Sequence, residues 1–199
     1  FKYMFIDECQ DFNSADIDDF RQHGTYCWFF GDSFQSIMEF PEHPVQSVED
    51  TAAQLGVHPQ DLCINWRLTI ENAKVGEHIR PKSRLSFACI KHGAKPRLVK
   101  SNAQLDKIIE YISNGNLTDV GILVYYNGQV TQIRDYFQSK GIPVQWKTKD
   151  AMDIDFKSTS PKIITWHCAK GLQFNDVFLP CCGLGEYRQF VLWPRDPMT

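Results

Sequence analysis

The sequence has no apolar run close to the length that a membrane-spanning helix needs, which is about 20 residues. It contains seven cysteines, but none forms a Cys-x-x-Cys pair or a Cys/His spacing typical of zinc sites. Cys181 and Cys182 are adjacent, which suits reduced thiols better than a disulfide framework. These absences argue against a membrane partner and a structural zinc site, and they favour a cytoplasmic location.

The sequence also lacks internal repeats, low-complexity tracts, an initiator methionine and a signal peptide. The sequence starts at Phe1 and ends at Thr199 without an obvious stop, so we interpret it as a segment of a longer protein. Hydrophobic residues make up 43% of the 199 residues and aromatic residues 13%. This composition excludes a disordered chain and provides enough apolar surface for a buried core.

Charge is distributed unevenly along the chain. Residues 1–62 hold 2 basic and 12 acidic side chains, a net charge of −10, whereas residues 63–199 hold 19 and 12, a net charge of +7. This asymmetry favours two lobes with different partners. Residues 80–100 contain no acidic side chain, and they form either a solvated connector or a surface that faces phosphates. The basic residues of this stretch are Arg80, Lys82, Arg84, Lys91, Lys95, Arg97 and Lys100.

Short apolar runs alternate with helical patterns, which predicts an α/β fold built on parallel strands. The runs expected to form strands are 1–6, 26–30, 120–125, 162–166 and 177–179, with a further strand-like stretch at 144–146. The patterns expected to form helices are 48–55, 69–78, 103–112 and 130–140. In such sheets ligands bind at the carboxyl ends of the strands. Polar residues in this position are Asp7, Glu8, Asp32, Gln35, His167 and Lys170.

The first such position holds two consecutive carboxylates, Asp7 and Glu8. Adjacent carboxylates repel each other, so a divalent cation close by would favour the ionised form of both. In nucleotide hydrolases the first carboxylate of such a pair holds Mg²⁺, and the second orients or deprotonates the attacking water. Taken alone, the pair favours the alternative interpretation, a solvated acidic turn that caps the next helix.

Three further motifs follow in order. The stretch 31–37, Gly-Asp-Ser-Phe-Gln-Ser-Ile, has a Gln that can point its amide at a phosphate oxygen. Asn65-Trp66-Arg67 has a planar aromatic ring for stacking on a base and a guanidinium for clamping a phosphate. The stretch 165–174, Thr-Trp-His-Cys-Ala-Lys-Gly-Leu-Gln-Phe, ends a strand with hydrogen-bond donors and a glycine.

Together with Asp-Glu-Cys-Gln-Asp at 7–11, these motifs resemble, in content and order, motifs II, III, IV and V of superfamily 1 helicases of the UvrD/Rep/PcrA type. The resemblance covers essentially the whole chain and implies RecA-like, P-loop NTPase-type lobes. Residues 1–64 would form the C-terminal part of the first lobe, which is incomplete here. Residues 65–199 would form the second lobe, truncated before motif VI. The stretch 147–162 is too short for the large subdomain inserted in bigger family members, so we expect a compact second lobe.

The resemblance also implies roles for individual residues. Asp7 would coordinate Mg²⁺ and Glu8 would act as the catalytic base, while Gln35 would sense the γ-phosphate of ATP. Departures from the family pattern affect the ribose and DNA contacts: Gln173 replaces a Glu, Met38 a Tyr, and Pro41 an Arg. The remaining residues implied to bind nucleotide are Trp66, Arg67, Gly171 and Gln173, and those implied to contact DNA are Phe40, Thr165 and His167.

No Gly-x-x-x-x-Gly-Lys-Ser/Thr sequence occurs among the 199 residues. The resemblance therefore implies a fragment of an ATP-dependent DNA helicase or translocase, which acts on single-stranded and duplex DNA and is inactive by itself. Two alternatives stay open. One is a helicase-like module that binds DNA or a repair partner without hydrolysis, and the other is the motor part of a helicase–nuclease.

Overall fold

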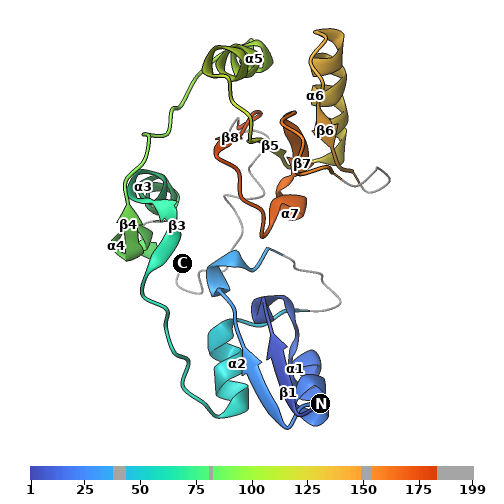
Figure 1. Cartoon of the computed structure of the whole chain (residues 1–199). Helices are drawn as coiled ribbons and strands as arrows, with labels where there is room; N and C mark the ends of the chain where they lie inside the picture. The colour runs from blue at the N-terminus through green and yellow to red at the C-terminus, as the bar shows by residue number, and fades with distance from the viewer. Residues whose placement is uncertain (38–43, 81–82, 149–153, 183–199) are drawn as a thin grey trace. The chain divides into compact units, whose positions relative to one another are not determined.

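The structure, a computed structural model, describes residues 1–37, 44–80, 83–148 and 154–182. It is a mixed α/β structure in which all paired strands are parallel (Figure 1). The chain divides into two compact units, Phe1–Leu98 and Val99–Thr199. The lobe boundary that we expected after residue 64 lies within the first of these units.

The first unit begins with a parallel pair of strands connected by a helix. Strand β1 pairs in register with β2, so that Tyr3 lies opposite Tyr26 and Ile6 opposite Phe29. Helix α1 starts with a capping box, in which the side chains and backbone N–H groups of Asn13 and Asp16 bond each other reciprocally. The elements of this part are β1 (Tyr3–Ile6), η1 (Cys9–Asp11), α1 (Ser14–His23), β2 (Tyr26–Phe29), η2 (Ser33–Gln35) and α2 (Val48–Leu55).

The two faces of the β1–β2 sheet differ in burial. One face packs on α1, where the Phe20 ring centroid lies 6.5 Å from that of Phe29. On the other face the exposed rings form a stacked cluster, with centroids 5.5 Å apart for Tyr3 and Tyr26 and 5.0 Å apart for Phe5 and Trp28. The period-two alternation of a strand separates these two sets of side chains.

The rest of the first unit has a second, two-stranded sheet, in which β3 (Asn65–Thr69) pairs with β4 (Cys89–Lys91). Its register is irregular, because Asn65 lies opposite Cys89 while Thr69 lies opposite Lys91. Helices α3 (Ile70–Ile79) and α4 (Leu85–Ala88) connect the two strands. The Thr69 side chain accepts a hydrogen bond from the Asn72 N–H, which caps the start of α3.

The second unit has a four-stranded sheet with the order β6-β7-β5-β8. The central pair, β5 and β7, aligns Gly121 with Lys162 and Val124 with Thr165. The strands are β5 (Val120–Val124), β6 (Gln145–Trp146), β7 (Lys162–Thr165) and β8 (Asp176–Phe178). The helices are α5 (Gln104–Gly115), α6 (Asn127–Ser139) and α7 (Trp166–Ala169).

The core of the second unit lies between this sheet and the apolar faces of α5 and α6 (Figure 1). Val130, Ile133 and Phe137 form one stripe of α6, and each is at most 2% exposed. This stripe confirms the helical pattern predicted for 130–140. The other buried members of the cluster are Ile108, Val120, Ile122, Val124, Val144 and Ile163.

The connection between β6 and β7 is consistent with the expectation that the stretch 147–162 holds no large subdomain. Its described residues, 147–148 and 154–161, form neither helix nor strand. Residues 149–153 lie outside the described part of the chain. In the described ranges, no helix is both long enough and apolar enough to cross a membrane.

Candidate functional site

Asp7 and Glu8 lie directly after β1, at the carboxyl end of the strand. The Asp7 carboxylate is exposed and accepts a hydrogen bond of 2.9 Å from the backbone N–H of Glu8. Glu8 is half-buried and adopts the left-handed conformation, with φ 54° and ψ 42°. Few residues other than glycine adopt this conformation, so the turn is backbone-strained at the predicted catalytic carboxylate.

Gln10 connects the end of β1 to the end of β2. Its side chain is fully buried, and its Nε2 donates a hydrogen bond to the Glu8 carboxylate. Its Oε1 accepts a hydrogen bond of 2.9 Å from the backbone N–H of Asp32. Both polar ends of the buried amide are therefore satisfied, and Gln10 holds the Glu8 side chain in place. We gave Gln10 no individual role from the sequence, although it belongs to the motif at 7–11.

Close packing around Gln10 requires a glycine at position 31. A Cβ atom on Gly31 would lie 2.6 Å from Gln10 Oε1 and 2.7 Å from Cys9 Sγ. The Cys9 thiol is buried here, and burial raises its pKa, with the nearby carboxylates of Asp7 and Glu8 acting in the same direction. Cys9 is therefore a neutral packing residue at this edge of the sheet.

Gln35 extends the network from the β2 side. Its Nε2 donates to Asp32 Oδ2 at 2.9 Å, and Asp32 Oδ1 accepts from the Phe34 N–H at 2.9 Å. A continuous series of hydrogen bonds thus crosses the carboxyl edge of the β1–β2 sheet, through Gln35, Asp32, Gln10 and Glu8. Three of the predicted site residues, Asp7, Glu8 and Gln35, lie at this one edge.

Trp66 and Arg67, also predicted to bind nucleotide, lie on β3 and so belong to a different sheet. The side-chain oxygen of Asn65 accepts hydrogen bonds of 2.9 Å from the N–H groups of Arg67 and Leu68, which shapes the start of this strand. The Trp66 ring is 64% exposed. The structure does not place these two residues in the sheet that carries Asp7 and Glu8.

The second unit has a cavity of about 400 Å³, lined mainly by residues with a polar group, at the carboxyl ends of β5 and β7. Thr165 is buried beside it, and its hydroxyl accepts a hydrogen bond of 3.3 Å from the Cys168 N–H. The His167 ring lies 5.8 Å from the Tyr125 ring, measured between centroids. The cavity therefore brings together Thr165 and His167, the two predicted DNA contacts of the last motif. It is lined by Tyr125, Asn127, Lys147, Thr148, Thr165, His167 and Cys168.

A second cavity of about 310 Å³ lies next to the first and shares Lys147 and Cys168 with it. Its remaining lining residues are apolar: Ile154, Phe156, Ile164 and Leu172. Sequence reasoning missed Tyr125, Asn127 and Lys147. Tyr125 is the last residue of an expected strand and Asn127 follows two residues later, so the strand-end rule could have identified them. Nothing in the sequence distinguishes Lys147.

The remaining predicted residues lie in the loop before β8 or outside the described part of the chain. Gly171 has a φ of 79°, and a Cβ there would meet nothing within 4 Å, so the backbone conformation alone favours glycine. Gln173 is exposed in the same loop, and neither residue lines the two cavities. Phe40 lies outside the described residues, as do Met38 and Pro41.

In the described ranges no three His, Cys, Asp or Glu side chains gather as a metal-binding group. A cation bound together with a nucleotide needs fewer protein ligands, because phosphates and waters complete its coordination. The exposed oxygens of Asp7 are of the chemical type that Mg²⁺ prefers.

A scan against protein-family models finds no match for this chain, and a search of curated proteins finds no match either.

Proposed function

We propose that this chain is part of the motor of an ATP-dependent DNA helicase or translocase, with RecA-like lobes as in superfamily 1. The observation that carries the proposal is the hydrogen-bonded series at the carboxyl edge of the β1–β2 sheet. It joins the carboxylate pair of one motif to the Asp and Gln of the next. A parallel sheet binds ligands at this edge.

Glu8 is the proposed general base, which accepts a proton from the water that attacks the γ-phosphate. The donor Nε2 of Gln10 orients the Glu8 carboxylate. Asp7 is the proposed Mg²⁺ ligand. Mg²⁺, when bound with ATP, neutralises charge on the phosphate oxygens. Gln35 is the proposed sensor, because its contact with Asp32 can be exchanged for one with a phosphate oxygen.

The cavity lined by Thr165 and His167 in the second unit is the proposed contact for single-stranded DNA. Its hydroxyl, imidazole and amide groups, from Thr165, His167 and Asn127, can donate hydrogen bonds to phosphate or base atoms. Lys147 adds a positive charge at the same cavity.

The decisive experiment uses the full-length gene product that contains this chain. We expect its ATPase to be stimulated by single-stranded DNA and to decrease at least about 1,000-fold in Glu8→Gln, with ATP binding retained. The matched control is Asp19→Asn, which removes an exposed carboxylate on α1. Near-normal hydrolysis by Glu8→Gln would contradict the assignment. DNA binding without any ATPase in the unmodified protein would instead favour the non-hydrolysing module.

Arg67 provides a second test in the same protein. A guanidinium that contacts the transferring phosphoryl group accounts for about 10³–10⁵ in rate, so Arg67→Ala should lower turnover by that factor. Arg21→Ala, on the exposed surface of α1, is the control and should retain the normal rate. Equal turnover in the two variants would remove Arg67 from the proposed site.

A further inference from the structure

The segment from Arg84 to Arg97 is the most basic exposed surface of the first unit. Arg84, Lys91, Lys95 and Arg97 are all exposed. In the described part of the chain, no ion pair involves Arg84, Lys91 or Lys95. Arg80 differs, because its guanidinium stacks 4.5 Å from the centre of the Phe34 ring.

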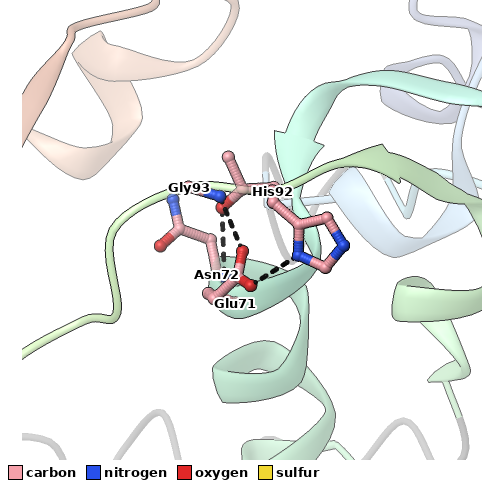
Figure 2. Close-up of polar contacts among 5 residues, drawn as sticks. Glu71, Asn72, His92 and Gly93 are labelled. Atoms are coloured by element: carbon pink, nitrogen blue, oxygen red, sulfur yellow. Dashed lines mark hydrogen bonds and ion pairs between the residues drawn. The ribbon is translucent and has the colours of Figure 1, made fainter.

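Helix α3 anchors this segment through Glu71 (Figure 2). One Glu71 oxygen accepts a hydrogen bond of 2.8 Å from the Gly93 N–H, and the other lies 2.9 Å from Nδ1 of His92. Gly93 fits closely against the start of the helix, since a Cβ atom there would lie 2.6 Å from a methyl carbon of Thr69. The chain just after β4 is therefore held at a defined place.

Glu77, one and a half turns further along α3, anchors the other end of the segment. Its carboxylate accepts hydrogen bonds from both the backbone N–H and the hydroxyl of Ser86, at 2.8 Å and 2.9 Å. Both acidic side chains of α3 thus bind backbone, hydroxyl or imidazole groups of the segment. The carboxylates fix the backbone without neutralising Arg84, Lys91 or Lys95.

A solvated connector has no need for such anchors, whereas a surface that binds a polyanion benefits from a fixed arrangement of cations. An aromatic side chain lies among these cations: Phe87, on α4, is 87% exposed. Cations interleaved with an exposed aromatic ring are typical of surfaces that bind single-stranded nucleic acid, where the cations follow the backbone and the ring stacks on a base.

We propose that the anchored segment Arg84–Arg97 binds single-stranded DNA, with Phe87 stacking on an unpaired base. The choice of DNA rests on the proposed function. Glu71 is a positioning residue in this surface and contacts no DNA itself.

The test measures binding of the 199-residue chain to labelled oligo(dT) by fluorescence anisotropy over a range of salt concentrations. The triple variant Arg84→Gln, Lys91→Gln and Lys95→Gln should bind about tenfold more weakly at low salt. The slope of log K against log salt should become less negative by about 2, since each cation contributes about 0.7 on a single strand. The control is Lys107→Gln, Lys140→Gln and Lys157→Gln in the second unit, which removes the same charge and should change neither quantity. Equal effects in both triple variants would overturn the proposal.

Phe87→Ala tests for base stacking, which contributes about 1–3 kcal/mol per base. The variant should weaken oligo(dT) binding about fivefold or more and leave binding to a blunt duplex unchanged, because duplex bases are already stacked. An unchanged affinity for oligo(dT) would overturn the assignment of the ligand as single-stranded DNA.

Glu71→Ala distinguishes positioning from charge. If only charge matters, removing an acidic side chain should strengthen DNA binding, because one repulsive negative charge is lost. We expect this result for the control Glu110→Ala on α5. Loss of the anchor should instead weaken binding about threefold, and tighter binding by Glu71→Ala would contradict the positioning role.

The same variants distinguish a failure of this inference from a failure of the proposed function. If Glu8→Gln still hydrolyses ATP while the triple variant loses DNA binding, this inference stands and the ATPase assignment fails.

Discussion

The side chain of Gln10 accepts a hydrogen bond from the backbone N–H of Asp32 at 2.9 Å, although 22 residues separate them in the sequence. The same amide donates to Glu8, so one buried side chain fixes two loop ends at once. Pre-organisation of this kind allows a carboxylate to act without reorganising during the reaction.

Replacing Gln10 by Leu should destabilise the first unit by about 1–3 kcal/mol, because the Asp32 N–H and the Glu8 carboxylate lose their buried partner. Urea unfolding of the 199-residue chain, followed by tryptophan fluorescence, measures the change. Gln22→Leu on the exposed side of α1 is the control and should shift stability by less than about 0.5 kcal/mol. Equal stability of the two variants would show that Gln10 does not join the strands.

Gly31→Ala should also destabilise the first unit, by about 1–3 kcal/mol, since its methyl group would overlap Gln10 and Cys9. Gly128→Ala in the first turn of α6 is the opposite case, because a Cβ there meets nothing within 4 Å. That substitution should stabilise the second unit by about 0.4–1 kcal/mol through reduced freedom of the unfolded chain. Thermal unfolding of both variants tests the pair, and destabilisation of similar size in each would contradict the packing argument.

The Glu71 contact should make the first unit sensitive to acid. The His92 side chain, followed by the Gly93 N–H, lowers the pKa of Glu71 from 4.5 to about 2. A lowered carboxyl pKa stabilises the fold fully above about pH 4.5, and this contribution is lost as the pH falls towards 2. His92→Ala should raise the pKa of Glu71 towards its ordinary value, whereas the exposed His58→Ala should not. NMR titration of the Glu71 carboxyl carbon measures both, and an unchanged pKa in His92→Ala would refute this cause.

Phe137 is completely buried in the core of the second unit. Phe137→Ala should therefore cost about 3–5 kcal/mol, as expected for a large side chain removed from a packed core. Phe156, which is 54% exposed, provides the comparison and should cost less than about 1 kcal/mol when truncated to Ala. Denaturant unfolding followed by circular dichroism measures the difference.

Elements that are short apolar runs, or that have an apolar stripe at helical spacing, could be predicted from the sequence. All five predicted strands are present with ends shifted by at most two residues, and the two-residue strand at Gln145–Trp146 lies within the strand-like stretch 144–146. The helix predicted at 48–55 has both ends confirmed, because Ser47 caps its start and Gly56, with φ 66°, ends it. Helix α6 starts three residues earlier than predicted, at Asn127, since its first turn contains no apolar side chain.

Elements stabilised by polar or distant contacts could not be predicted this way. Helix α1 was missed because Ile17 is its only buried residue and most of the others are polar, although Asn13 and Asp16 signal its start. Strands β3 and β4 were missed because neither is an apolar run: β3 contains Asn65 and Arg67, and β4 has only three residues. At the candidate site, the strand-end rule selected Asp7, Glu8, Asp32 and Gln35 together. It could not reveal that the buried amide of Gln10 connects them, because a glutamine in sequence gives no sign of burial.

The strand order β6-β7-β5-β8 has a consequence for synthesis on the ribosome. Strand β5 occupies an inner position, yet both of its partners, β7 and β8, are encoded later in the chain. A nascent chain that has not reached Lys162 therefore exposes the apolar Val120–Val124 with both edges unpaired, a state prone to association with other strands. The sheet can close only after β8 has emerged, so most of the core of the second unit forms late in the synthesis of this segment.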